Sequence, residues 1–299
     1  LPTISALEHK VFVPPFARKF PTAQIFIAPN QWSFPVNLPL RWLGFPGKRT
    51  HILPEDSSKT PFAGEFDYAI LGPIDLNLGY FEEVVFYHKK TRTLLVTDSI
   101  VSIPEEPPEI IQLEPYPLLF HARESAIEPI EDTPANRRKG WQRICLFSMY
   151  FRSSVLEVPQ WGKVFKNAFK ASDRSRQAYF GLYPFQWQAT WRQCFSTLRG
   201  NGRILVAPIL QTLILNRAPK ETLSWVEKVA SWNFQTIIPC HLDSPIAAGS
   251  IQFCQAFSFL QQYSLNSFYS LPEEDFQVLR EIDKSLSKTK IIPPPKEKV

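Results

Sequence analysis

The chain has 299 residues, of which 44% are hydrophobic and 14% aromatic, so it can bury a large core and its composition does not predict disorder. Its formal net charge of +5 is small, and its basic residues form no clustered run of the kind that nucleic-acid-binding proteins use. The longest apolar run, from Ile204 to Leu215, is shorter than the roughly 20 residues of a membrane-spanning helix. We therefore expect a soluble globular protein with no membrane span.

The first residues predict a loop followed by a helix. The chain begins at Leu1 and not at a methionine, and a motif follows at once, so we expect a fragment or a processed product whose targeting segment is missing. Pro14 and Pro15 would start a helix that runs to Phe20. Short strands are then predicted at residues 24–28, 50–53, 66–71, 83–88 and 93–97. The last two flank residues 89–92, a polar hairpin turn.

The middle of the chain predicts a change from extended segments to helices. Five prolines between residues 102 and 118 predict turns and extended chain, because proline disfavours helix interiors. Thr133 and Pro134 then form an N-cap and first turn for a helix that reaches Tyr150. Further helices are expected at 159–170, 187–199, 218–231, 251–262 and 272–287, with buried strands at 203–207 and 236–239. This alternation predicts a layered α/β architecture, with residues 291–299 as an extended, solvated tail.

Polar side chains stand at or just after the ends of three of these segments. His9 closes the opening loop, Asp98 follows strand 93–97, and His241 follows strand 236–239. Side chains at the mouths of apolar strands cluster at one edge of a sheet, where α/β proteins form their sites. Imidazole and carboxylate together are a common ligand set for zinc or iron. The competing interpretation is that these are hydrogen-bonded structural residues.

Two neighbours of His241 are open to more than one interpretation. Cys240 is a candidate nucleophile or metal ligand, but neighbours along a strand point to opposite faces, so we expect a buried thiol. Asp243 would either hold the His241 ring by a hydrogen bond, as a second-shell residue, or cap the loop. The cysteines are widely spaced with no C-x-x-C pair, which favours buried thiols in a reducing compartment: Cys145, Cys194, Cys240 and Cys254.

Three segments in this chain order resemble the metallo-β-lactamase superfamily. Thr3–His9 is similar to its histidine-rich loop, Val96–Asp98 to the strand end that carries its bridging aspartate, and Ile238–His241 to the segment of its C-terminal histidine. Further stretches over essentially the whole chain, among them Trp32–Gly47 and Asn136–Gln142, resemble one uncharacterised family, a domain of unknown function of cyanobacteria and plant and algal plastids.

The resemblance carries expectations for fold and location. It implies an N-terminally truncated metallo-β-lactamase-like αββα sandwich, formed by residues 1–290 as a single domain with a helical insertion at about 134–200. It also implies a protein of the plastid (chloroplast) or of the cyanobacterial cytoplasm.

The resemblance further implies the loss of one metal site and the retention of part of another. The superfamily's first metal needs two early histidines, and Ile4 and Ala6 stand in those positions, so that site is lost. Asp75 is a weaker candidate ligand near the position of the superfamily's mid-chain histidine. The positions that hold the second metal are occupied by four possible ligands of a single zinc or iron ion: Glu8, His9, Asp98 and His241.

Two functions of different classes follow. The first is a degenerate single-metal hydrolase that uses a metal-bound water to cleave an ester, thioester or phosphoester, which the survival of His9, Asp98 and His241 favours. The second is a non-catalytic binding or assembly protein that kept the fold without metal and binds a small molecule or a protein, which Ile4 and Ala6 favour.

Overall fold

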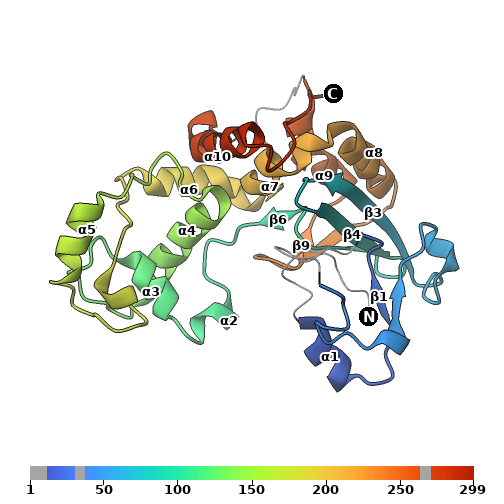
Figure 1. Cartoon of the computed structure of the whole chain (residues 1–299), viewed down its shortest axis with the longest axis horizontal. Coiled ribbons are helices and arrows are strands. Elements are labelled where there is room, and N and C mark those ends of the chain that lie inside the picture. Colours follow the sequence, from blue (N-terminus) through green and yellow to red (C-terminus); the bar gives the residue numbers. More distant parts are fainter. Residues whose placement is uncertain (1–11, 31–37, 263–270) are drawn as a thin grey trace. The chain divides into compact units, whose positions relative to one another are not determined.

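The computed structural model describes residues 12–30, 38–262 and 271–299. The chain divides into two compact units (Figure 1). Unit 1 comprises residues 1–101, 204–270 and 282–299, and unit 2 comprises residues 102–203 and 271–281. Unit 2 therefore contains the segment expected as a helical insertion, 134–200, together with the proline-rich residues before it and a short segment near the end of the chain.

Unit 1 is built on a five-stranded sheet with the strand order β3-β4-β5-β8-β9. Its strands are β3 (Phe66–Asp75), β4 (Tyr80–His88), β5 (Thr93–Val96), β8 (Thr236–Pro239) and β9 (Ile246–Ala247). Strands β5 and β8 are parallel, with Val96 opposite Pro239, and the other neighbours are antiparallel. The chain thus leaves β5 and β8 at the same edge of the sheet.

Both faces of this sheet are covered by apolar side chains. Val85 of β4 lies in the larger core, which α8 (Pro219–Ala230) and α9 (Ser250–Ala256) complete on one face (Figure 1). Phe86, the next residue of β4, lies in a smaller core on the other face with Phe26. This alternation along a strand with cores on both sides gives a layered structure, as the mixed α and β pattern of the sequence predicts.

Phe26 belongs to a small two-stranded sheet, in which β1 (Ile25–Ile27) and β2 (Thr50–Ile52) pair in parallel. The shorter elements of unit 1 are α1 (Val13–Lys19), η2 (Gly47–Arg49), η3 (Ser57–Lys59), β7 (Ile204–Leu205), α7 (Pro208–Leu213), η6 (Leu215–Arg217) and η7 (Ser258–Leu260). The tail is extended, but it is also held in place, because Lys296 N donates to Asn216 O at 2.9 Å and Val299 N to Leu260 O at 3.0 Å.

Unit 2 is mainly helical. Its elements are α2 (Glu109–Gln112), α3 (Tyr116–Ala122), α4 (Pro134–Tyr150), α5 (Trp161–Ala168), η4 (Tyr179–Gly181), α6 (Trp191–Arg199), η5 (Gly200–Gly202) and η9 (Glu273–Phe276). Two further elements contain a boundary between the units: β6 (Val101–Ser102) and α10 (Gln277–Lys288). None of the helices in the described part of the chain combines the length and the apolar character that crossing a bilayer requires.

Helices α3 and α4 approach each other at a glycine. A Cβ atom on Gly140 of α4 would lie 1.7 Å from the carbonyl oxygen of Leu118, so no larger residue fits between the two backbones. Helix α4 begins as its sequence predicts, because Thr133 Oγ1 accepts a hydrogen bond from Asn136 N at 3.1 Å and Pro134 occupies the first helical turn.

The proline-rich stretch differs from the expectation of extended chain. Helix α3 starts at Tyr116, directly after Pro115, and has Pro117 in its first turn. The expectation was wrong because the amide group that proline lacks has no partner in the first turn of a helix anyway. Several short elements of the described chain were also not predicted, among them α2, α7 and β9. Helix α7 starts at Pro208 inside the apolar run, and β9 has only two residues, too few for a recognisable alternation.

Candidate functional site

The structure brings together two of the predicted site residues, Asp98 and His241. The Nε2 atom of His241 lies 2.9 Å from the Oδ1 atom of Asp98. They meet because Asp98 follows β5 and His241 follows β8, and these parallel strands end at the same edge of the sheet. The side chain of His241 is 47% exposed and that of Asp98 21% exposed, so solvent and solutes reach the pair.

A third acidic group, Glu83 of β4, belongs to the same site and was not predicted. Its Oε1 atom accepts hydrogen bonds from Thr97 N at 3.1 Å and from Ser99 Oγ at 2.6 Å, the residues on either side of Asp98. Burial, and after it the negative charge of Asp98, raises the pKa of Glu83 to about 8, although both hydrogen bonds oppose the shift. At neutral pH the Glu83 carboxyl therefore carries its proton.

The other oxygen of Glu83, Oε2, is buried and has no hydrogen-bond partner among the described residues. Glu83 is thus a neutral acid next to the partly buried carboxyl group of Asp98. The sequence does contain a signal for Glu83, because two glutamates, Glu82 and Glu83, interrupt an otherwise apolar strand. The sequence predicts a strand that begins at residue 83, which places these two residues at its end and not in its interior. Glu82 points to the opposite face, where its Oε1 and Oε2 atoms accept from Asn30 Nδ2 at 2.7 Å and Asn30 N at 2.8 Å.

Cys240 is exposed, so the expectation of a buried thiol was wrong. Strand β8 buries Ile237 and Pro239, and the alternation along the strand therefore exposes Ile238 and Cys240. Partial desolvation of the sulfur, followed by the charges of Asp98 and Glu83, raises the pKa of the Cys240 thiol to about 11. The thiol is protonated at neutral pH and is a weak nucleophile. Cys145 and Cys194 are buried as expected, and Cys254 is exposed.

Two weaker candidates, Asp75 and Asp243, are not part of the Asp98–His241 pair. Asp75 ends β3, and its Oδ1 atom accepts a hydrogen bond from Asn77 N at 2.8 Å, so it stabilises the turn between β3 and β4. Asp243 is exposed, and within the described ranges no hydrogen bond joins it to His241. Asp98 contacts the His241 ring.

Asp98 and His241 offer one carboxylate oxygen and one imidazole nitrogen, which are donor types that zinc and iron accept. The 2.9 Å between His241 Nε2 and Asp98 Oδ1 is the distance of a direct hydrogen bond or ion pair between the two side chains. The other two predicted ligands, Glu8 and His9, lie outside the described residues. Among the residues that are described, no three or more His, Cys, Asp and Glu side chains form a metal-binding group.

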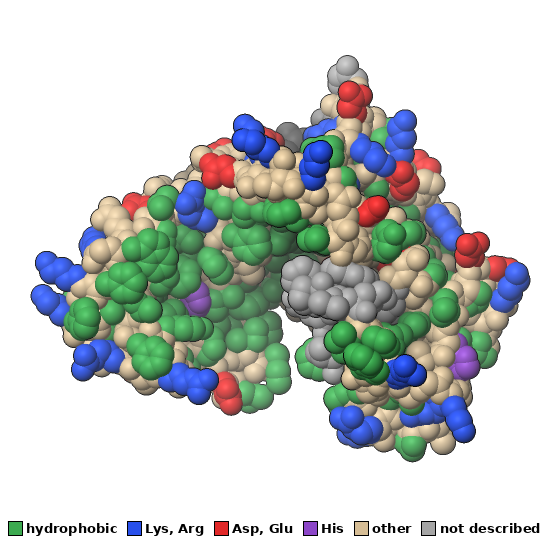
Figure 2. Space-filling view, viewed as in Figure 1, with side chains coloured by type: hydrophobic (Ala, Val, Ile, Leu, Met, Phe, Trp, Pro, Cys, Tyr) green, Lys and Arg blue, Asp and Glu red, His purple; other side chains and the backbone are tan. Residues whose placement is uncertain are grey.

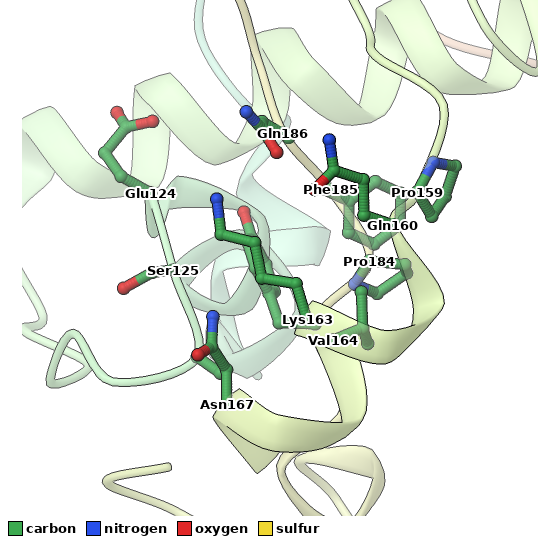
Figure 3. A pocket seen from close by; sticks show the side chains of 12 residues that line it. Glu124, Ser125, Pro159, Gln160, Lys163, Val164, Asn167, Pro184, Phe185 and Gln186 are labelled. Carbon is green, nitrogen blue, oxygen red and sulfur yellow. The ribbon is translucent and has the colours of Figure 1, made fainter. Parts of the chain in front are cut away.

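Unit 2 contains a separate pocket of about 190 Å³ (Figure 3). Lys163 and Asn167 project from α5 into it, with Ser125 on one side and Gln160 on the other. Glu124 also lines the pocket, but its carboxylate already pairs with other residues, Arg143 at 2.8 Å and Lys139 at 2.6 Å. The remaining lining residues are Ala126, Pro159, Val164, Tyr183, Pro184, Phe185 and Gln186. Amide groups and one ammonium thus dominate the polar lining.

A family model described as "Domain of unknown function (DUF4336)" matches residues 1–259. The chain belongs to this family. The DUF4336 match includes Glu83, Asp98, Cys240 and His241, and it also includes the pocket of unit 2. The expectation of an uncharacterised domain family is therefore confirmed. No curated protein and no solved structure matches the chain.

Proposed function

We propose that the Asp98–His241 pair is the centre of a hydrolase, in a degenerate relative of the metallo-β-lactamase superfamily, that cleaves an ester, thioester or phosphoester. The observation that carries the proposal is the 2.9 Å contact between His241 Nε2 and Asp98 Oδ1 at the carboxyl ends of two parallel strands. Sites of α/β proteins form at such edges. The mixed sheet of unit 1, with helices over one face, supports the relationship in fold.

Asp98 and His241, together with Glu8 and His9, would hold one zinc or iron ion. When bound, such an ion lowers the pKa of a coordinated water and polarises the bond that is cleaved. Asp98 and His241 would supply one oxygen and one nitrogen ligand from the loops that follow β5 and β8, and the parallel pairing of these strands sets where the two loops begin. Glu8 in place of an aspartate carries one more methylene, which changes the position of its carboxylate.

Glu83 supports the same role from behind the pair. Because its pKa is about 8, it is neutral at pH 7 and does not add a second negative charge beside Asp98. Its hydrogen bonds to Thr97 N and Ser99 Oγ hold the backbone on both sides of Asp98. Glu83 is therefore a positioning residue that fixes the loop carrying Asp98.

The experiment is a hydrolysis assay on the full chain with zinc(II) or iron(II) added, using p-nitrophenyl acetate, p-nitrophenyl phosphate and an acyl thioester as probes. We expect turnover of at least one probe, and a loss of about 100-fold or more in Asp98→Asn and His241→Ala, because each removes a group that acts at the reacting centre. His51→Ala is the matched control, since His51 is an exposed histidine of β2 outside this site. Equal rates in all four proteins would reject the proposal.

The second function, a binding protein without catalysis, is favoured by the pocket of unit 2. Its amide groups and Lys163 suit a small polar or anionic ligand. A thermal-shift screen of sugars, nucleotides and organic acids tests it. A ligand that raises the melting temperature of the wild type, but not that of Lys163→Ala, together with no hydrolysis of any probe, would favour this function over the first.

A further inference from the structure

Helix α5 of unit 2 displays a stripe of aromatic side chains to solvent. Trp161, Phe165 and Phe169 recur every four residues and are 56%, 54% and 80% exposed. The helix buries Val164 and Ala168 instead. The rings of Trp161 and Phe165 lie with their centroids 6.1 Å apart, so they form a continuous apolar surface. Rings of this size are normally the largest contributors to cores and interfaces, which makes an exposed stripe of three informative.

A neighbouring turn, η4, adds two more exposed rings. Tyr179 and Phe180 are 63% and 67% exposed, and both have positive φ angles, 51° and 57°. Aromatic residues rarely adopt this conformation. Gly181 anchors the turn against the end of α5, because a Cβ atom on it would lie 2.8 Å from the carbonyl oxygen of Ala168. The two segments therefore lie side by side, and we call their exposed rings the aromatic patch: Trp161, Phe165, Phe169, Tyr179 and Phe180.

The aromatic patch lies in a basic part of the chain. Residues 158–181 contain five Lys and Arg residues and one Asp, a net charge of +4, whereas the whole chain has +5. The one acid, Asp173, is engaged by Tyr116 Oη at 2.9 Å and Ser175 N at 2.8 Å. Figure 2 shows hydrophobic side chains bordered by Lys and Arg side chains at the part of unit 2 where Figure 1 labels α5.

The lysines of α5 border the stripe and do not interrupt it. At about 100° of rotation per residue, they occupy the side of the helix that faces away from the buried Val164 and Ala168. The exposed lysines are Lys163 and Lys166 of α5 and Lys170, which follows the end of the helix at Ala168. Aromatic rings on one face with lysines along its flank are the composition of helices that lie in the interface of a membrane.

We propose that the aromatic patch docks unit 2 on the surface of a bilayer that contains anionic lipids. The Trp161 ring suits the headgroup level, Phe165 and Phe169 suit the acyl boundary, and the flanking lysines suit lipid phosphates. The net charge of +4 over residues 158–181 complements the negative surface of such a bilayer, which is why we commit to lipid as the occupant of the patch. This docking is peripheral and independent of the hydrolase proposed for unit 1.

The experiment is co-sedimentation of the full chain with vesicles of phosphatidylcholine alone or with about 30% phosphatidylglycerol. Two double variants alter the patch, Phe165→Ser/Phe169→Ser and Lys166→Glu/Lys170→Glu. The matched control is Ile110→Ser/Leu113→Ser, which removes two other exposed apolar side chains of unit 2, on and next to α2. Circular dichroism of each variant checks that the fold is kept.

We expect the wild type and the control to bind the anionic vesicles and each patch variant to bind at least about tenfold more weakly. We also expect weaker binding as salt rises, since the lysine contribution is screened beyond about 8 Å at 0.15 M ionic strength. Failure of the wild type to sediment with anionic vesicles overturns the proposal. So does equal binding by Phe165→Ser/Phe169→Ser, or a wild type that forms dimers through the patch and ignores vesicles.

Discussion

The Oδ1 atom of Asp98 lies 2.9 Å from the Nε2 atom of His241, although the two residues come from distant parts of the chain. The parallel pairing of β5 and β8 creates this contact, and the neutral acid Glu83 lies behind it. Asp98, His241 and the buried carboxylic acid Glu83 thus share one sheet edge.

Glu83 is expected to make stability depend on pH. Its pKa is about 8 in the folded chain and about 4.5 as the ordinary value, so the folded state binds one more proton between these two pH values. The stabilisation that this group contributes is fully present below pH 4.5. As pH rises from 4.5 toward 8, the free energy of unfolding falls by on the order of 1 kcal/mol per pH unit. Urea unfolding from pH 5 to 8 measures this slope. Glu83→Gln should flatten it, and an unchanged slope in that variant would show that Glu83 ionises normally.

Cys240 is expected to react slowly despite its exposure. Because its pKa is about 11, a very small fraction of the thiol is ionised at pH 7, and the thiolate is the reactive form. Iodoacetamide labelling followed by mass spectrometry should show a rate that rises steadily from pH 7 to 10. Labelling at pH 7 as fast as that of free cysteine, with a plateau below pH 8.5, contradicts the raised pKa.

Gly140 and Gly162 provide a matched pair of helix glycines. Gly140→Ala places a Cβ atom 1.7 Å from Leu118 O and should destabilise unit 2 by about 3 kcal/mol. Gly162→Ala, in α5, meets no atom within 4 Å and should stabilise the helix by up to about 1 kcal/mol, because alanine favours helix. Thermal unfolding of both variants tests the opposite signs, and a neutral Gly140→Ala variant would mean that α3 and α4 do not approach this closely.

Arg143 and Arg138 provide a matched pair of arginines on α4. Arg143 is buried, and its guanidinium donates to both Glu124 carboxylate oxygens, at 2.8 and 2.9 Å, and to Arg123 O at 2.9 Å. Arg143→Met removes these hydrogen bonds from a buried position and should cost about 2 kcal/mol. The loss is no larger because Glu124 keeps its ion pair with Lys139 and Arg123 O still accepts from Tyr183 Oη. Arg138 forms an exposed ion pair with Glu106, and Arg138→Met should cost less than about 1 kcal/mol. Urea unfolding compares them, and equal losses would refute the assigned role of Arg143.

Local signals in the sequence were enough to predict the elements that carry the site. Thr133 and Pro134 define the start of α4, and strand 236–239 is the observed β8. Asp98 was expected at a sheet edge because it follows a short apolar strand, and that local signal does not depend on the partner strand.

Features that depend on tertiary contacts were not predictable. The raised pKa of Glu83 comes from burial by distant segments and from Asp98, which no local pattern contains. The exposure of Cys240 depends on which face of β8 packs against the core, and the sequence of that strand is apolar on both faces. The aromatic stripe of α5 also resembles a buried helix face, since periodicity alone does not tell which of two apolar stripes is covered.

The most direct test of the Asp98–His241 centre is the metal content of the purified full-length protein, measured by elemental analysis after expression with zinc and iron in the medium. We predict about one zinc or iron ion per chain in the wild type and in the control His51→Ala, and none in Asp98→Asn/His241→Ala. A wild type without stoichiometric metal, or a double variant that keeps it, would contradict the account.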